Sequence, residues 1–408
     1  MLFNPNIKIV IIMVGLPARG KSYISYNLAK YFRWNSYNVR IFNLGDYRRD
    51  LLGGFQDHTF FDDNNLECKN IRNKIAYEVF DDLCIWLSKD NNHIAIYDAT
   101  NTTKERREYL LKKSKIYNFA SLFIESICDD KKIIENNLKM KLISKDYFNK
   151  SDKEYATKDF NNRLKHYEKI YEEISDQDTS YIKLINNKKK IIINNVYNSI
   201  GIEVINYINN LRITTSPIYL SRHGESEANL KGLLGGNSFL SKNGKKYINK
   251  IDEFFSKENG VENLRIFTSI LNRTVETASK ISKKYKTTNL KILNEINAGI
   301  CEGLTYEQVK EYHPEIYDGR KKDKFNYRYP NGESYKDIVD RVKPFILETE
   351  KLEKPVLIIS HNAITRVIYS YLMDIPQQQI PHFDIPLHTI IKLIPTSKGY
   401  KEERIKLL

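Results

Sequence analysis

Residues 7–14, Ile-Lys-Ile-Val-Ile-Ile-Met-Val, run directly into residues 15–22, Gly-Leu-Pro-Ala-Arg-Gly-Lys-Ser. The first stretch is almost continuously apolar and β-branched, which is typical of a strand buried on both faces of a parallel sheet. The second fits GxxxxGK[ST], a loop whose backbone N–H groups point at phosphate oxygens. The alternative is a plain glycine turn before an amphipathic helix. The order of strand, loop and helix favours a phosphate-binding α/β fold.

More strand candidates follow, separated by helix-like polar segments. They lie at residues 39–44, 94–97, 122–126 and 181–185. Such alternation indicates right-handed βαβ units and a parallel sheet. Residues 154–175 are charged with a helical period, and the polar residues 144–153 predict a loop.

The pattern restarts after Thr214-Thr-Ser-Pro217, where proline and small polar residues indicate a joint between domains. At 408 residues the chain is long for one core. We therefore predict two α/β domains, 1–213 and 214–408. Strand candidates of the second alternation lie at residues 218–221, 266–269, 356–360 and 389–394.

Two histidines of the second half follow apolar runs that predict adjacent parallel strands. His223 stands in Arg222-His-Gly224, and His361 lies 138 positions later. A neutral imidazole can accept a phosphoryl group, and an arginine fork can bind the phosphate oxygens. A single histidine is more often structural, but the neighbouring Arg and Gly favour chemistry. The partners that we predict are Arg222, Arg273 and Glu295, with Glu295 protonating the leaving alkoxide and later activating water.

In the first half, Lys21 is predicted to reach the β and γ phosphates and Ser22 to ligate magnesium. Asp98 ends an apolar run, where an acidic residue suits a magnesium partner or a base. The alternative for Asp98 is a helix cap. The basic pairs Arg48-Arg49 and Arg106-Arg107 follow strands, where ligand-facing loops begin, although ordinary surface charge would look the same.

The net charge of +14 fits an enzyme of polyphosphorylated metabolites or a nucleic-acid binder. The basic residues are dispersed, and the densest run, 188–190, is typical of a solvated turn, so we expect no nucleic-acid partner. The four cysteines contain no CxxC pair, which suits a reducing compartment. No apolar stretch approaches the ~18 residues of a membrane span. We expect a cytoplasmic protein without a membrane partner.

Longer sequence motifs resemble those of the bifunctional 6-phosphofructo-2-kinase/fructose-2,6-bisphosphatase family, and the resemblance runs from about residue 8 to the end. Those of the kinase half are residues 15–25, Asp46-Tyr-Arg-Arg49, Asp98-Ala-Thr-Asn-Thr-Thr103, Glu105-Arg-Arg107 and Phe123-Ile-Glu-Ser-Ile-Cys128. Those of the second half are Arg222-His-Gly-Glu-Ser-Glu227, Leu293-Asn-Glu-Ile296, Ala298-Gly299, Tyr327-Arg-Tyr-Pro330, Gly332-Glu-Ser-Tyr335 and Pro386-Leu-His388. They are also similar to the wider histidine phosphatase superfamily.

This resemblance implies a P-loop mononucleotide-binding kinase fold followed by a histidine phosphatase (phosphoglycerate mutase-like) fold. It implies that ATP, with Mg²⁺, phosphorylates the 2-hydroxyl of fructose 6-phosphate, and that the product is hydrolysed through a phosphohistidine. Such a chain would set the level of a glycolytic signal, and the family tends to form homodimers.

For the kinase half, the resemblance carries over the following positions. Catalytic positions are Lys21, Asp98 and Cys128, and Ser22 and Asp98 would hold Mg²⁺. The nucleotide positions are Gly15, Leu16, Pro17, Ala18, Arg19, Gly20, Lys21, Ser22, Tyr23, Asn137, Lys139 and Lys141. The fructose 6-phosphate positions are Arg48, Arg72, Thr100, Arg106, Arg163 and Tyr167. The Asn-x-Lys word is one residue shorter than in the family, and Asp46 replaces a usual Gln.

For the phosphatase half, Arg222, His223, Arg273, Glu295 and His361 match catalytic positions. Substrate contacts would come from Asn229, Gly235, Tyr306, Arg320, Lys324, Tyr335, Asn362 and Arg366. Asn362 stands where the family has Gln. Two alternatives stay open: a phosphatase whose kinase half only binds nucleotide as a regulatory module, and a nucleic-acid repair kinase–phosphatase.

Overall fold

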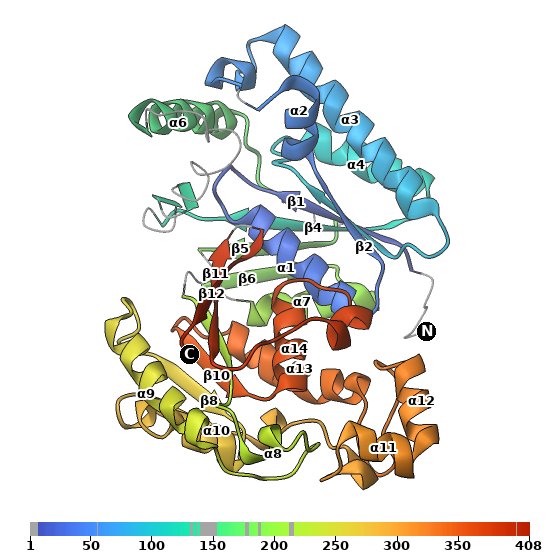
Figure 1. Cartoon of the computed structure of the whole chain (residues 1–408). Coiled ribbons are helices and arrows are strands. Elements are labelled where there is room, and N and C mark those ends of the chain that lie inside the picture. The colour runs from blue at the N-terminus through green and yellow to red at the C-terminus, as the bar shows by residue number, and fades with distance from the viewer. Residues whose placement is uncertain are drawn as a thin grey trace. The chain divides into compact units, whose positions relative to one another are not determined.

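The computed structural model of the chain describes residues 7–54, 56–130, 134–135, 137–138, 153–175, 179–186, 189–211, 216–396 and 398–408. The chain divides into two compact units, Met1–Ile213 and Thr214–Leu408. Each unit contains one six-stranded sheet with helices packed against it (Figure 1). Both are α/β units, as the sequence predicts.

The first sheet has the strand order β2-β3-β1-β4-β5-β6. Its strands are β1 (Ile9–Val14), β2 (Val39–Asn43), β3 (Ile94–Asp98), β4 (Ala120–Ile127), β5 (Tyr181–Ile185) and β6 (Lys190–Asn194). The first five are parallel, which confirms the predicted parallel sheet, and β6 pairs antiparallel with β5. The sequence missed β6, because Lys190, which we assigned to a solvated turn, begins it; Lys188 lies outside the described residues.

The helices of this unit are α1 (Lys21–Trp34), α2 (Leu44–Leu52), η1 (His58–Phe61), α3 (Leu66–Ser88), α4 (Lys104–Ile116), α6 (Lys153–Lys169) and α7 (Ser199–Asn210). All six residues of β1 are fully buried. Val10, Ile12 and Val14 share one core with α3 and α4. The helices α1 and α7 also pack together, with the rings of Tyr31 and Tyr207 stacked at 4.4 Å between centroids. Burial on both faces explains the unbroken apolar run.

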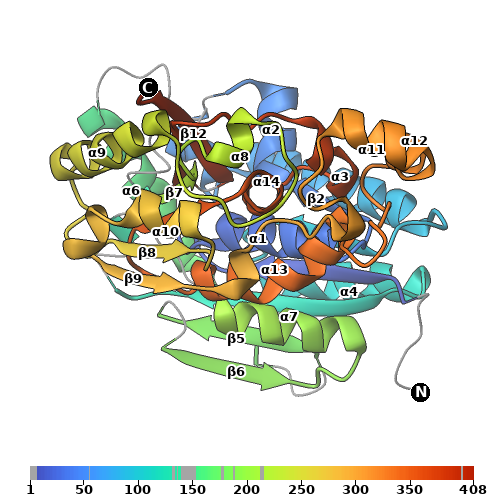
Figure 2. The same ribbon diagram turned by 60° about the horizontal axis from the view of Figure 1, so that its bottom comes forward.

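The second sheet has the order β12-β11-β7-β10-β8-β9. Its strands are β7 (Ile218–Arg222), β8 (Arg265–Thr268), β9 (Lys286–Asn289), β10 (Val356–Ser360), β11 (Thr389–Thr396) and β12 (Gly399–Lys406). The strands β7, β10, β8 and β9 are parallel neighbours, and Figure 2 shows β8 beside β9. The strand predicted at residues 389–394 is β11, which runs antiparallel to β7 and forms a hairpin with β12.

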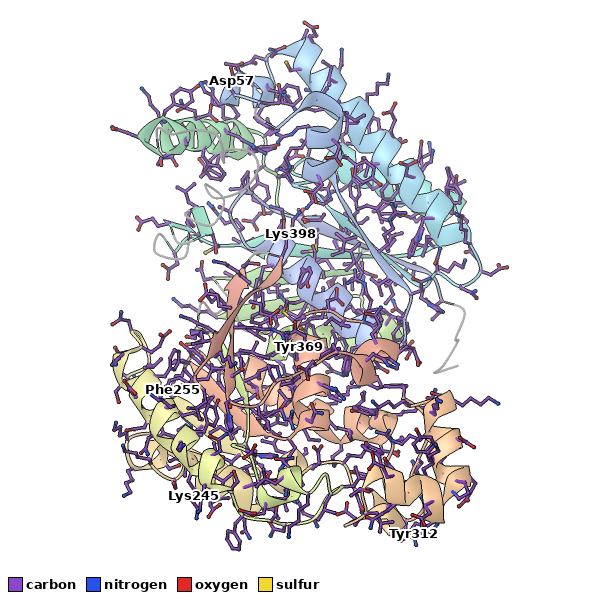
Figure 3. The ribbon with its side chains drawn as sticks, viewed as in Figure 1. Asp57, Lys245, Phe255, Tyr312, Tyr369 and Lys398 are labelled. Atoms are coloured by element: carbon purple, nitrogen blue, oxygen red, sulfur yellow. The ribbon has the colours of Figure 1, made fainter. Side chains whose placement is uncertain are left out.

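The helices of the second unit cover this sheet. They are α8 (Glu227–Leu230), α9 (Lys242–Lys257), α10 (Asn272–Ala278), η2 (Ile281–Lys283), η3 (Lys291–Leu293), η4 (Gly299–Cys301), α11 (Tyr306–Tyr312), α12 (Pro314–Lys322), α13 (Tyr335–Glu350), α14 (Asn362–Leu372) and η5 (Gln377–His382). In α9, Phe255 is buried in the core while Lys245 is exposed (Figure 3), as an amphipathic helix requires. Among the described residues, no helix combines the length and apolar character of a membrane span.

Candidate active sites

The glycine-rich loop leaves the carboxyl end of β1 and enters α1. Gly15, Ala18 and Gly20 have positive φ angles of 131°, 58° and 81°. Gly20 is the N-cap of α1 in the left-handed conformation that glycine adopts most easily. A Cβ atom on Gly15 would lie 2.4 Å from the carbonyl oxygen of Ser126 on β4. The loop therefore needs glycine at both ends to turn tightly onto the positive end of the α1 dipole.

Neighbouring side chains hold this loop in shape. Asn101 Nδ2 donates to the carbonyl of Met13 at 2.8 Å, and Ser126 Oγ donates to the carbonyl of Arg19 at 2.5 Å. Asn137, a predicted nucleotide contact, donates from Nδ2 to the carbonyl of Ala18 at 3.0 Å. The structure thus brings Asn137 to the loop. Its predicted companions Lys139 and Lys141 lie outside the described residues.

Lys21 and Asp98 are buried at this edge of the sheet, with 8% and 4% of their surface exposed. Lys21 Nζ donates to the carbonyl of Leu16 at 2.6 Å, so the ammonium group lies over the loop. Asp98 ends β3, next to β1, and accepts from Asn43 Nδ2. Because the carboxyl ends of parallel strands meet at one edge, the loop and the carboxylate lie at the place where α/β proteins bind ligands.

Ser22 and Asp98 are the residues predicted to hold Mg²⁺. Ser22 is the second residue of α1, and Asp98 is the last residue of β3. A hydroxyl and a carboxylate are hard oxygen donors, and Mg²⁺ is usually held by one or two such groups together with phosphate oxygens and water. The donor set fits a cation that is shared with nucleotide phosphates.

Phe61 gathers three of the predicted sugar-phosphate contacts around its ring. The guanidinium groups of Arg163 on α6 and Arg48 on α2 lie 3.7 Å and 5.1 Å from the ring centroid. The ring of Tyr167 lies 6.0 Å away. Contact with one aromatic ring stabilises both cations in the absence of an anion. The sequence analysis missed Phe61. This residue lies in the short helix η1, whose N-cap residue, Asp57, is labelled in Figure 3.

Arg72 lies on α3, and Arg106 on α4 contacts the neighbouring residue of that helix, Asn73. Arg72 donates to the carbonyls of Phe60 and Asp62 and to the carboxylate of Asp63. Arg106 donates to Asn73 on α3 and lies 5.6 Å from the ring of Tyr77. Thr100 lies apart from them at the loop, where its carbonyl accepts from Gly15 N at 2.9 Å.

Cys128 lies beside the loop, within electrostatic reach of Arg19. Burial raises the pKa of its thiol. A thiol of this kind stays protonated near neutral pH. Asp46, which stands where the family usually has Gln, is paired with Arg49 at 2.6 Å.

In the second unit, β7 and β10 are adjacent and parallel, with Arg222 opposite Ser360, as the sequence predicts. The imidazoles of His223 and His361 therefore face each other, with 5.1 Å between ring centroids. Arg273 Nε lies 3.2 Å from His223 Nε2 and 3.2 Å from His361 Nδ1. One guanidinium N–H group thus stands between two imidazole nitrogens, which is a site shaped for a phosphoryl oxygen.

The hydrogen bonds define the proton positions on both rings. His223 Nδ1 lies 2.7 Å from the carbonyl of Gly224, which can only accept, so Nδ1 carries the proton and Nε2 keeps its lone pair. His361 Nδ1 accepts from Arg273, so its Nε2 carries the proton and donates to Ser269 Oγ at 2.8 Å. Burial, followed by Arg273, lowers the pKa of His223 well below its usual range. His223 is therefore a neutral imidazole whose Nε2 lone pair is directed at Arg273.

Glu295 lies in the loop after η3, and its Oε1 accepts from the backbone N–H groups of Ile296 at 2.9 Å and Ala363 at 3.2 Å. The second bond places the carboxylate at the start of α14, two residues after His361. Glu295 also interacts electrostatically with Arg222 and Arg273. The five predicted catalytic residues thus converge on one place.

The predicted substrate contacts include three cations, Arg366, Lys324 and Arg320, which follow on from Arg222 through a series of pairwise interactions. Arg366 donates to the hydroxyl of Tyr335 at 3.0 Å and interacts with Arg222. Lys324 interacts with Arg366 and Arg320. The guanidinium of Arg320 lies 5.1 Å from the ring of Tyr306. Such a row of positive charge suits a substrate with a second anionic group.

The remaining predicted substrate contacts are Asn229, Gly235 and Asn362. Asn229 Oδ1 accepts from the backbone and hydroxyl of Ser226, which closes the capping box of α8. Gly235 has a φ of 65°, and a Cβ atom there would lie 1.8 Å from Glu302 Oε2. Asn362 begins α14.

The sequence analysis missed two residues that support the two histidines. Ser269 Oγ accepts a hydrogen bond from His361 Nε2, and Ser269 directly follows β8, where a single hydroxyl gives no sequence signal. His388 Nε2 accepts from the backbone N–H of Glu225 at 3.0 Å, next to the His223 turn. The sequence analysis quoted the motif Pro386-Leu-His388, but it did not predict this hydrogen bond.

The comparisons with known proteins cover both units. Residues 2–215 match the family 6-phosphofructo-2-kinase, and residues 218–407 match the histidine phosphatase superfamily (branch 1). A 6-phosphofructo-2-kinase/fructose-2,6-bisphosphatase of Aquarana catesbeiana is 42% identical over 406 residues, covering 98% of this chain and 85% of that protein. The form 4 enzyme of Homo sapiens is 41% identical, covering 98% and 86%. Among solved structures, an alpha-ribazole phosphatase from Shigella flexneri is similar to 47% of this chain and 96% of its own, with 21% identity and a TM-score of 0.42.

The fold and the two sites define a fusion of a P-loop kinase with a histidine phosphatase. Given the relatives that match along its length, the chain belongs to the 6-phosphofructo-2-kinase/fructose-2,6-bisphosphatase family.

Proposed function

We propose that this chain makes fructose 2,6-bisphosphate from ATP and fructose 6-phosphate in its first unit and hydrolyses it to fructose 6-phosphate and phosphate in its second. It is a bifunctional enzyme of glycolytic regulation. The observation that supports this most directly is Arg273 Nε, placed 3.2 Å from both facing imidazoles in a chain that also carries a complete glycine-rich loop.

In the kinase unit, which uses ATP, the residues do little covalent chemistry. The loop amides and Lys21 bind the triphosphate, while Arg48, Arg163 and Tyr167 bind the sugar phosphate. Asp98 accepts the proton of the sugar 2-hydroxyl while the hydroxyl oxygen forms a bond to the γ-phosphorus. The bond from the γ-phosphorus to the β–γ bridging oxygen breaks, and ADP leaves. Bound Mg²⁺, held by Ser22 and Asp98 with the phosphates, would neutralise charge on the transferred group. Positioning and charge neutralisation account for most of the rate.

In the phosphatase unit, His223 Nε2 attacks the phosphorus at C2, forming a P–N bond while the P–O2 bond breaks. The leaving oxygen takes a proton from Glu295. Arg222 and Arg273 stabilise the charge on the equatorial oxygens. His361 joins them when its Nδ1, rather than its Nε2, carries the proton, so that the Nδ1–H group can donate to a phosphoryl oxygen. The Glu295 carboxylate then activates a water that releases phosphate and frees His223.

The test uses the full-length purified chain with ATP, fructose 6-phosphate and fructose 2,6-bisphosphate. Initial rates of synthesis and of breakdown are measured side by side, and both are expected. Breakdown without synthesis would instead support the phosphatase with a regulatory kinase half. Absence of both reactions would refute the proposal.

Breakdown is expected to weaken above pH 8. Burial, with Arg320 and Arg366, lowers the pKa of Lys324 to about 8. Below that pH Lys324 is charged and attracts the second phosphate. Above it binding must take up a proton, so KM rises by at most about tenfold per pH unit. The measurement is KM between pH 7 and 9. Lys324→Arg flattens this rise, and the exposed control Lys322→Arg keeps it. An unchanged rise in Lys324→Arg would contradict the assignment.

A further inference from the structure

We propose that Glu333 and Arg341 are positioning residues that hold the Glu295 loop from both sides. The inference rests on the proposed acid–base role of Glu295. Neither residue was singled out by its chemistry in the sequence, and neither contacts the reacting atoms in the proposed mechanism. They are half-buried and form an ion pair, with Arg341 Nε 2.8 Å from Glu333 Oε1.

Arg341, on α13, holds the residues before Glu295. Its Nη1 donates to the carbonyl of Ile292 at 2.7 Å, and both Nη atoms donate to the carbonyl of Asn294 at 3.1 Å. The planar fork of an arginine can bind these two carbonyls and a carboxylate at once, which a lysine cannot.

Glu333 holds the residues after Glu295. Its Oε2 accepts from the backbone N–H of Asn297 at 3.0 Å, and its own N–H donates to the Asn297 carbonyl at 2.9 Å. The turn that carries Glu333 packs closely here, since a Cβ atom on Gly332 would lie 2.4 Å from the Asn297 carbonyl oxygen. Glu333 thus binds Asn297 through one backbone–backbone hydrogen bond and one side chain–backbone hydrogen bond.

The ion pair therefore joins the two ends of a short irregular segment. Within the segment, Glu295 accepts hydrogen bonds from Ile296 and Ala363. Leu293 and Asn294 also accept from Ser360 Oγ and from the Ile270 N–H group, whereas Glu333 and Arg341 hold both flanks at once. A proton donor acts only within hydrogen-bond reach of the leaving oxygen. A clamp on both flanks therefore helps to keep the loop-borne carboxyl group at that distance.

The test compares Glu333→Gln and Arg341→Lys with the wild-type full-length chain. Glu333→Gln keeps the shape and removes the charge, whereas Arg341→Lys keeps the charge and removes the fork. Rapid quench gives the single-turnover rate of phosphohistidine formation from fructose 2,6-bisphosphate, and its substrate dependence gives Kd. We expect the rate to fall by about 10- to 100-fold, as for small misplacements of a catalytic group, with Kd within about twofold.

A second readout separates positioning from general support of the site. p-Nitrophenyl phosphate has a leaving group that departs as a stable anion and needs no proton from Glu295. Its burst rate should be unchanged in both variants. If the wild-type chain does not cleave this ester, the rate and Kd with the natural sugar decide alone.

The matched control is Arg328→Met, which removes the ion pair of Arg328 with Asp337 at the start of the same helix. It should leave the rate and Kd unchanged. An unchanged rate in Glu333→Gln and Arg341→Lys, or a rate and affinity that fall together, would overturn the inference. A wild-type chain that forms no acid-labile, base-stable phosphoprotein would instead show that the proposed function itself fails, and the clamp with it.

Discussion

Replacing His223 by alanine should abolish the breakdown of fructose 2,6-bisphosphate and leave its synthesis intact. His223 Nε2 carries the lone pair that attacks phosphorus, and alanine offers no substitute. Removing a nucleophile of this kind costs about 10³-fold or more in kcat. The first unit has its own sheet and core, so its loop should not sense the change.

The measurement is the initial rate of both reactions on the full-length variant. His313→Ala serves as the control, because that partly exposed histidine lies between α11 and α12 and interacts with Glu315. It should retain both rates. Breakdown that persists in His223→Ala would point to another nucleophile, and loss of synthesis as well would contradict two independent sites.

Replacing Lys21 by alanine should do the reverse. The ammonium group lies over the glycine-rich loop at 2.6 Å from the Leu16 carbonyl, where the β and γ phosphates are predicted to bind. Without it, the negative charge of the transferred group loses a preorganised cation. Losses of about 10²- to 10³-fold are typical for one such donor in a buried site.

Synthesis and breakdown are again measured together, with Lys112→Ala, an exposed position on α4, as the control. Synthesis should fall in Lys21→Ala alone, with breakdown unaffected. A Lys21→Ala chain that still makes the bisphosphate at the wild-type rate would remove Lys21 from the proposed mechanism.

The sequence predicted the strands whose apolar residues are buried and also the edge strand β2, but it missed the edge strands β6, β9 and β12. The strand β9 reads Lys-Thr-Thr-Asn and β12 contains the charged run Lys401-Glu-Glu-Arg404, because edge strands can face water and then carry little apolar signal. The direction of β11 could not be predicted, because a hairpin with β12, rather than a helical crossover, sets it. Such pairing depends on residues that carry no motif.

The site residues also differ in how far the sequence could predict them. Residues in long sequence motifs, such as the loop from Gly15 to Ser22 and Arg222-His223, could be named in advance because their chemistry requires a fixed local order. Phe61 and Ser269 could not, since a single ring in a short helix and a single hydroxyl after a strand have no spacing signature. Their roles exist only once Arg163 and His361 are folded onto them.

The paired imidazoles also bear on acid tolerance. Burial holds the pKa of His223 and of His361 well below the value near 6.5 that they have in an unfolded chain. Below that pH the two imidazoles bind protons in the unfolded chain but not in the native second unit. The free energy of unfolding therefore falls on acidification by up to about 1.4 kcal/mol per pH unit for each ring. Melting curves of the intact chain between pH 7 and 5 would show it. The buried site that keeps His223 neutral for attack on phosphorus therefore makes the second unit less stable in acid.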